Sequence, residues 1–308
     1  MQRSCKLDID LPPLSRVHEY GSTPVAPYTR THDENGNFLG GQPGVDETLT
    51  YDAFNRLVGY SGAGGSPSAQ YTYDAFGRRI QTIVVDASGA VTTRYVYHGD
   101  RVIEEVDETA TSLIASYVYG NDIDEVLRMR RDVDGIGGAE DYFYHQDDLF
   151  NVVALTDENG DVVERYDYGD YGTPEVMDAS GTPRTGTAYA NPYLFQGRRY
   201  DTESSLYYFR ARYLDPATGR FTSRDPLGIW ADLLNLGNGY TFAGNNPWSR
   251  RDPFGLESGG NQKSWLDRLR DHWQTRQAMR RALMRAVGFI PESYIEFDSS
   301  VRESVTSL

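Results

Sequence analysis

Two aspartates near the end of the sequence stand in the same short pattern. Asp225-Pro-Leu-Gly228 and Asp252-Pro-Phe-Gly-Leu256 each place a carboxylate before a proline, with a glycine three residues after it. Two carboxylates that a fold brings together cannot both ionise at close range. One then serves as general base for a water and the other as general acid. These residue types predict aspartic-protease chemistry, provided that the fold brings Asp225 and Asp252 together.

The same pattern has a purely structural interpretation. Asp-Pro followed by Gly is an ordinary turn signal, and Asp215-Pro-Ala-Thr-Gly219 is a related segment that we interpret only as a turn. The sequence alone therefore leaves both interpretations open for Asp225 and Asp252. The choice depends on the elements that position them.

Most of the chain before these two motifs is a tandem repeat. Tyr51-Asp-Ala-Phe-Asn-Arg56 and Tyr73-Asp-Ala-Phe-Gly-Arg78 share Tyr-Asp-Ala-Phe-x-Arg, and weaker copies follow. The anchor residues of the repeats step by 19, 22, 24, 22, 25 and 24 residues, which is the length of two short strands and two turns. They are His32, Tyr51, Tyr73, Tyr97, Tyr119, Tyr144 and Tyr168.

Each repeat has the pattern of a β-hairpin. Tyr71 and Tyr73 fall on one face of an alternating run, a Gly or Asn turn follows, and a second run such as 152–155 completes the unit. One hairpin cannot bury its apolar face alone, so consecutive hairpins should stack into a continuous spiralling sheet. The alternative is a set of unrelated hairpins in a sandwich. The predicted class is all-β in either case.

The repeats and a longer block resemble the RHS or YD-repeat family with its repeat-associated core. The block consists of Phe195-Gln-Gly-Arg-Arg-Tyr-Asp201, Leu206-Tyr-Tyr-Phe-Arg-Ala-Arg-Tyr-Leu-Asp-Pro216, Thr218-Gly-Arg-Phe221 and the two Asp-Pro motifs. The resemblance covers roughly residues 28–256. It implies a hollow β-cocoon that sequesters a variable C-terminal polypeptide, commonly a toxin, until delivery. With six or seven repeats, this chain is expected to form part of such a shell.

The resemblance also implies a reaction and partners. Asp225 and Asp252 would cut the Leu256–Glu257 bond and release the tail, with Arg224 as a nearby charge that positions a carboxylate or the scissile carbonyl. Residues 229–251 form a longer gap than is usual in the family, with 229–235 as the insertion. The expected partners are the chain's own C-terminal tail as cargo, a shell-capping or secretion-system protein, and an immunity protein.

Composition argues against several other kinds of binding site. The formal net charge of −15 argues against attraction of the whole chain to nucleic acid or anionic lipid. One cysteine, Cys5, excludes an intrachain disulfide framework and a cysteine-built zinc site. The five histidines have no metal-ligand spacing, and Asp157-Glu-Asn-Gly-Asp161 is interpreted as a hairpin turn and not a calcium loop. We predict no cofactor, no metal and no transmembrane segment, and no secretion signal is visible.

Four segments are predicted: an N-terminal extension (1–27), YD repeats (28–190), the core (191–256) and a variable tail (257–308). The tail begins with a Gly-rich linker, and residues 264–287 predict one basic amphipathic helix of about +5 charge. That helix suits docking on an acidic shell, or on nucleic acid or membrane; the simpler interpretation is a solvated helix face held against the shell. Because the chain opens within a repeat-like pattern, we interpret it as a fragment or a short copy of a longer protein.

Three alternatives to a delivery scaffold stay open. The first is a protein whose main activity is its own aspartic-protease processing. The second is a cell-surface adhesion or recognition protein, because tyrosine-rich β surfaces stack on sugars and bind other proteins. The third is a toxin active in residues 257–308, for which some fifty residues are few. Export by a specialised secretion machine or display on the cell surface would fit the absence of a visible signal.

Overall fold

The computed structural model describes residues 31–40, 46–133, 138–228 and 237–256. Two antiparallel sheets contain all of the strands described. The larger is a meander in which fifteen strands pair in chain order. Its strands are β1 (Thr31–His32), β2 (Phe38–Gly40), β3 (Thr48–Tyr51), β4 (Leu57–Ser61), β5 (Ser68–Tyr73), β6 (Arg79–Asp86), β7 (Gly89–His98), β8 (Arg101–Asp107), β9 (Ser112–Tyr119), β10 (Val126–Arg131), β11 (Glu140–Gln146), β12 (Val152–Thr156), β13 (Val162–Tyr168), β14 (Pro174–Asp178) and β15 (Pro183–Arg184).

The Tyr-Asp-x-x-x-Arg repeat forms its own turn. After β5, Asp74 Oδ1 accepts the N–H groups of Phe76 and Arg78, both at 2.9 Å. The Arg78 Nε donates to the other carboxylate oxygen at 2.7 Å. Asp52 and Arg56 repeat the arrangement after β3. The aspartate therefore satisfies backbone donors that a tight turn would otherwise leave free.

The anchor tyrosines join each hairpin to its neighbour. The Tyr73 hydroxyl donates to the Leu57 carbonyl at 2.6 Å, and Tyr168 donates to Val152 at 2.7 Å. The guanidinium of Arg56 lies 4.8 Å from the centre of the Tyr73 ring, which is a cation–π contact between successive repeats. The spacing of the repeat along the chain thus brings the anchor tyrosine of one hairpin into contact with the preceding hairpin.

The smaller sheet belongs to the core block. It pairs in chain order and consists of β16 (Arg199–Asp201), β17 (Leu206–Phe209), β18 (Arg212–Asp215) and β19 (Arg220–Phe221). Short 3-10 turns at Phe195–Gly197 and Ala243–Asn245 flank it. All residues of β17 and β18 are buried, so this sheet lies inside the molecule.

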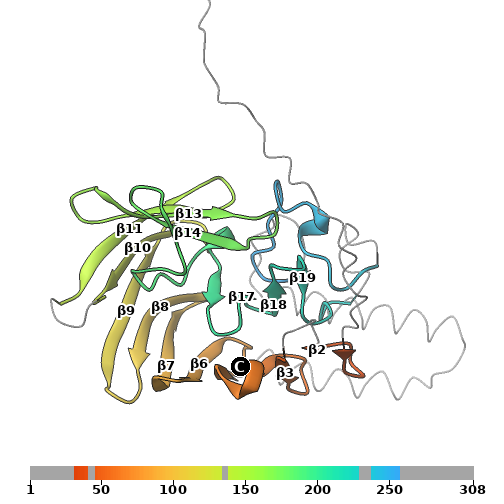
Figure 1. Ribbon diagram of the computed structural model, residues 1–308. Coiled ribbons are helices and arrows are strands. Elements are labelled where there is room, and N and C mark those ends of the chain that lie inside the picture. The colour runs from red at the N-terminus through yellow and green to blue at the C-terminus, as the bar shows by residue number, and fades with distance from the viewer. Residues whose placement is uncertain (1–30, 41–45, 134–137, 229–236, 257–308) are drawn as a thin grey trace, which may run out of the picture.

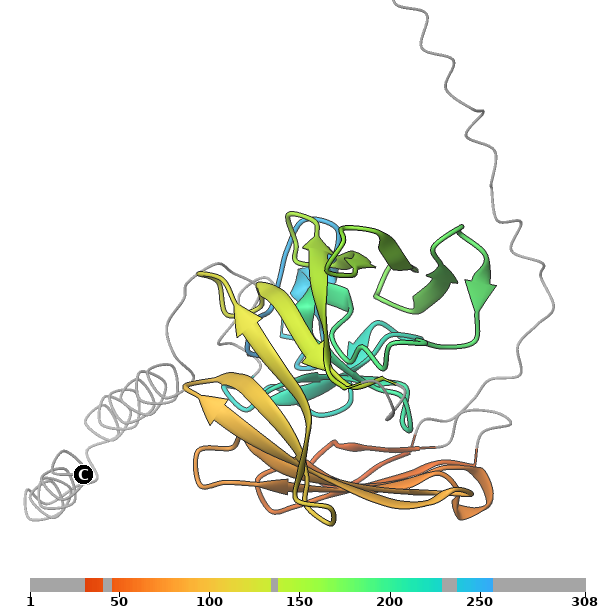
Figure 2. The same cartoon turned by 90° about the vertical axis from the view of Figure 1, so that its left-hand side faces the viewer.

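The larger sheet curls around the smaller one. Figures 1 and 2 show β2–β6 on one side of β17–β19 and β10–β14 on the other. Two apolar clusters fill the space between the sheets. One packs Tyr117 and Tyr144 against Phe209, and the other packs Tyr71 against Tyr208. The hairpins therefore bury their tyrosine faces on the core block, as a stacked repeat requires.

The structure confirms the all-β class and the stacked hairpins. The anchors Tyr51, Tyr73, Tyr97, Tyr119, Tyr144 and Tyr168 fall in alternate strands, β3 to β13, so one repeat is one hairpin. The predicted extension at 1–27, the Gly-rich linker and the tail helix at 264–287 lie outside the described residues. Closure into a cocoon and the four segment boundaries stay predictions.

Candidate self-cleavage site

One buried arginine contacts both predicted aspartates. Arg212 opens β18, and its Nη2 lies 3.3 Å from Asp225 Oδ2 and 3.4 Å from Asp252 Oδ2. The arginine side chain is 1% exposed and each carboxylate 2%. Because a single nitrogen reaches both carboxylates, the fold brings together two aspartates that are far apart in the sequence.

Each aspartate also forms a turn of its own. Asp225 Oδ1 accepts the N–H of Leu227 at 2.8 Å, and Asp252 Oδ1 accepts the N–H of Leu256 at 2.9 Å. The backbone adds a contact from Gly255 N to the Asp252 carbonyl at 3.3 Å. The turn and the paired carboxylates therefore coexist, because Oδ2 of each aspartate contacts Arg212 while Oδ1 accepts the backbone N–H of its turn.

Gly255 allows the second turn to approach β17 and β18 closely. Its φ is +68°, and a Cβ at this position would lie 2.6 Å from the Phe209 carbonyl oxygen. A side chain there is excluded by contact as well as by backbone strain. The close approach lets Arg212 Nε donate to the Gly255 carbonyl, so the arginine holds the turn and its carboxylate together.

Two further arginines hold the same turn from the other side. Arg198 Nη1 donates to the Pro253 carbonyl at 2.8 Å, and Arg210 Nη1 donates to the same oxygen. Both guanidinium groups share one carboxylate, Asp124, at 2.5 and 3.0 Å. Burial, and then the charge of Arg210, lower the pKa of Arg198 to about 10, which still leaves it protonated at neutral pH.

Leu256 is fixed by packing and by hydrogen bonding. Its side chain is fully buried in a small cluster with Leu227 and Phe254, which brings the two Asp-Pro turns into apolar contact. Its N–H is held by Asp252. The structure therefore orders the chain up to the last residue before the predicted scissile bond. Glu257 lies outside the described residues.

Arg224, the cation that the sequence singled out, contacts a different region. Its side chain is exposed, and its Nε donates to the Tyr240 hydroxyl at 3.1 Å. Tyr240 in turn donates to the Gly36 carbonyl at 2.6 Å. Sequence reasoning did not single out Arg212. A signal was present in Arg210-Ala-Arg212, where charges fall in a strand-forming, tyrosine-rich segment and so require buried anionic partners.

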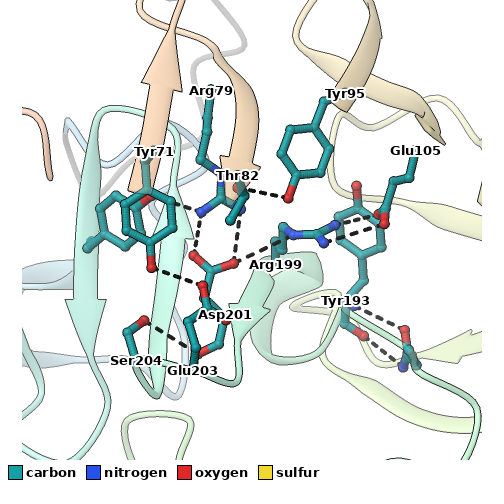
Figure 3. A network of polar contacts seen from close by, with 12 residues as sticks. Tyr71, Arg79, Thr82, Tyr95, Glu105, Tyr193, Arg199, Asp201, Glu203 and Ser204 are labelled. Carbon is teal, nitrogen blue, oxygen red and sulfur yellow. Dashed lines mark hydrogen bonds and ion pairs between the residues drawn. The ribbon is translucent and has the colours of Figure 1, made fainter. Parts of the chain in front are cut away.

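A buried ion-pair network fixes the core sheet to the shell (Figure 3). Arg79 of β6 donates to Asp201 of β16, with Nη2 to Oδ1 at 2.9 Å, and also to the Tyr213 hydroxyl at 2.9 Å. Arg199 pairs with Glu105 of β8. Burial alone would raise the pKa of Glu105, but the charge and hydrogen bond of Arg199, together with Arg131 and Tyr117, lower the pKa below its ordinary value. Tyr213 follows Arg212 in β18, so the network also holds the strand that carries the site arginine.

Among the described residues, no group of three or more His, Cys, Asp or Glu side chains lies in an arrangement able to hold a metal ion. Over the same residues, no helix has the length and apolarity needed to cross a membrane.

A curled sheet of Tyr-Asp hairpins around a small core sheet defines a YD-repeat shell protein. The chain belongs to the Teneurin YD-shell family, whose model matches residues 11–248. The match includes the repeats, Arg212 and Asp225, and it ends shortly before Asp252.

Curated relatives match over part of the chain. The tRNA(Glu)-specific nuclease WapA of Bacillus subtilis subsp. natto is 40% identical over 115 residues, which are 37% of this chain and 5% of the relative. Toxin protein Tse5 of Pseudomonas aeruginosa is 38% identical over 124 residues, or 40% and 8%. The double-stranded DNA deaminase toxin A of Burkholderia cenocepacia is 33% identical over 119 residues, or 38% and 8%. The match thus spans less than a tenth of each of these relatives.

Solved structures share the fold. The crystal structure of TcdB2-TccC3-Cdc42 aligns with a TM-score of 0.56 and 20% identity over 73% of this chain and 11% of that one. A Tc holotoxin pore of Photorhabdus luminescens, with a mutated TccC3, aligns with a TM-score of 0.56 and 18% identity. This alignment covers 76% of this chain and 11% of that one. At this identity the likeness establishes the shell fold alone.

Proposed function

We propose that this chain is the end of a toxin-type shell that holds its own C-terminal segment as cargo and releases it by cutting the Leu256–Glu257 bond. The observation that carries the proposal is the contact of Asp225 and Asp252 with one buried arginine, next to the ordered Leu256. A structural turn needs neither the second aspartate nor a shared cation.

The two carboxylates would divide the chemistry between them. Two carboxylates held against the same guanidinium repel each other, and one proton shared by the pair relieves that repulsion. The ionised carboxylate takes a proton from a water, whose oxygen attacks the Leu256 carbonyl carbon. The protonated carboxyl supplies a proton so that Glu257 leaves as an amine, and Leu256 becomes a carboxylate.

Arg212 is the positioning residue in this proposal. It holds both carboxylates and also the Gly255 carbonyl, one residue before Leu256. The clamp of Arg198 and Arg210 on Pro253 restricts the same turn. Rigid placement of reacting groups is worth several kcal/mol of an activation barrier, which is why buried arginines suit this role better than flexible surface ones.

The delivery role rests on the relatives. Proteins named as a nuclease, a toxin and a deaminase toxin each share a segment with this chain, although their names indicate different activities. A shared shell and core with variable cargo accounts for that pattern. The proposed partners are therefore the segment 257–308 as cargo, a protein that caps or exports the shell, and an immunity protein against the cargo.

Intact-mass spectrometry of the freshly purified chain tests the cleavage. The wild type should appear as two polypeptides that divide between Leu256 and Glu257, whereas Asp225→Asn and Asp252→Asn should each stay whole. Asp215→Asn is the matched control, because Asp215 is also a buried Asp-Pro turn residue in the core block and its carboxylate holds Ala217 and Thr218. It should leave the cut unchanged.

Two outcomes would contradict the proposal. If the wild type stays whole for days in the folded state, the paired aspartates are structural. If the Asp225→Asn and Asp252→Asn chains are cut like the wild type, a contaminating protease is responsible. Circular dichroism on each variant separates loss of cleavage from loss of the fold.

A further inference from the structure

A second polar site lies where the shell hairpins meet the core block, on the side of the network drawn in Figure 3. A pocket there is lined by six arginines and several tyrosines from both sheets. The arginines are Arg78, Arg79, Arg101, Arg198, Arg199 and Arg210. The proposed cleavage reaction uses only Arg198 and Arg210 of this set, and only through the Pro253 carbonyl.

Three of the six arginines are paired with carboxylates. Arg78 pairs with Asp74, Arg79 with Asp201, and Arg199 with Glu105. Arg199 also lies 3.6 Å from Asp201, so these three arginines are tied into ion pairs and form the wall of the pocket.

The other three arginines have fewer carboxylate partners than they have positive charges. Arg198 and Arg210 share Asp124, while Arg101 donates to the carbonyls of Asn121 and Asp122 and lies 5.5 Å from the centre of the Tyr119 ring. One further carboxylate, Asp100, lines the pocket. The carboxylate of Asp122 pairs with Arg251, so within the described residues these three guanidinium groups face the two carboxylates of Asp124 and Asp100.

A buried donor in the same place is unsatisfied. Within the described part of the chain, Arg198 Nε has no hydrogen-bond acceptor, and the residue is only 5% exposed to solvent. A buried guanidinium donor without an acceptor costs free energy comparable to a lost charged hydrogen bond. An anion in the pocket would supply both the missing acceptor and the missing charge.

The size of the pocket limits the ligand. Its volume is about 50 Å³, and a single water needs roughly 10–15 Å³ on this measure, so the space suits a group of a few heavy atoms. Carboxylate and phosphate groups have this size, and guanidinium groups bind both through paired hydrogen bonds. A whole nucleotide is too large.

We propose that this pocket is an oxyanion-binding site in which Arg101, Arg198 and Arg210 hold a carboxylate or phosphate group. Bound anion also screens the repulsion between Arg198 and Arg210 and so strengthens their clamp on Pro253. The site goes beyond the proposed cleavage and does not depend on it, because no atom of Asp225 or Asp252 takes part.

Calorimetric titration of the full chain tests the site, with inorganic phosphate in one arm, acetate in the second and chloride at matched ionic strength as the blank. The Asp252→Asn chain is titrated in parallel, so that failure of cleavage and failure of anion binding are separate results. We expect saturable binding of phosphate, acetate or both, weakened about tenfold or more in Arg101→Gln, because a charged hydrogen bond contributes roughly 1.5–3 kcal/mol.

Arg130→Gln is the matched control, since Arg130 is an exposed arginine of β10 outside the pocket, and it should bind like the wild type. Phosphate binding alone identifies a phosphate source, and acetate binding alone a carboxylate source. Either result supports the site. Heat no greater than with chloride, or equal weakening in Arg101→Gln and Arg130→Gln, overturns it. Arg101→Lys is the second variant if Arg101→Gln does not fold.

Discussion

The repeat turns of the shell and the Asp-Pro turns of the core contain similar hydrogen bonds from backbone N–H groups to an aspartate, but the aspartates contact arginines in different ways. Asp52 and Asp74 each accept backbone N–H groups two and four residues ahead, and each pairs with its own arginine at the fourth position. Asp225 and Asp252 make equivalent backbone bonds, to Leu227 and to Leu256. The two core aspartates, however, share one arginine from a distant strand.

Burial and shared contacts, and not the turn itself, therefore separate the two core aspartates from the aspartates of the shell turns. A shell turn is partly exposed, electrically neutral and repeated along the sheet. The core pair is buried, and both of its carboxylates contact the same guanidinium. Loss of a shell pair should therefore be tolerated, whereas loss of the core arginine should not.

Replacement of Arg212 should have the largest effect. Arg212→Met leaves two buried carboxylates without their cation, and the removal of one partner from a buried ion pair costs about 3–5 kcal/mol. Urea unfolding of the variant beside the wild type measures this loss. Adding Asp225→Asn and Asp252→Asn to Arg212→Met should restore much of the stability, because the uncompensated charges are then gone. A loss below about 1 kcal/mol for Arg212→Met would show that the comparison is wrong.

Glu203 should make the junction between core and shell sensitive to pH. Burial, and then the charge of Asp201, raise the pKa of Glu203 to about 7 from an ordinary value of 4.5, and its carboxyl accepts a hydrogen bond from Tyr71 at 2.9 Å. The folded chain therefore holds this proton more tightly than the unfolded chain. Stability should fall by on the order of 2 kcal/mol as the pH rises from about 5 to above 7, then level off.

Urea midpoints between pH 5 and pH 8 measure the Glu203 effect. Glu203→Gln should remove most of this slope, whereas Glu158→Gln, an exposed turn residue of the shell, should keep it. The same slope in both variants would assign the pH dependence to another group.

Loss of one anchor hydroxyl should have a smaller effect. Tyr168→Phe removes the hydrogen bond to the Val152 carbonyl and leaves the ring packing in place, so the expected loss is about 1 kcal/mol. Thermal unfolding checks the value, with Tyr171→Phe, a nearby tyrosine outside the repeat pattern, as the comparison. A loss as large as that of Arg212→Met would mean that the repeats are less redundant than we argue.

Removal of a shell arginine should have the smallest effect. Arg56→Gln breaks a partly exposed ion pair with Asp52, and such pairs contribute roughly 0–1 kcal/mol. We expect a loss below 1 kcal/mol in urea unfolding and unchanged cleavage by intact mass. A large loss would show that the stacking of Arg56 on Tyr73 supports the shell more than its charge balance indicates.

The repeat, the hairpins and the Asp turns could be predicted from the order of the amino acids. These features are local: alternation places Tyr71 and Tyr73 on one face, and each Asp74-type carboxylate bonds to backbone groups within four residues. Such contacts recur at every period of the chain, so they leave a readable pattern.

The arginine that contacts the two aspartates could not be predicted from the sequence, because it depends on long-range packing. Arg224 is adjacent to Asp225 in sequence, yet its side chain lies on the surface beside Tyr240, whereas Arg212 reaches the pair from β18. The shared pocket of arginines is likewise assembled from both sheets. Contacts of this kind occur once, between segments far apart in the chain, and they depend on how the larger sheet curls around the core. The repeat pattern does not predict that curvature. The individual hairpins and turns could therefore be predicted from the sequence, whereas the contacts of the site could not.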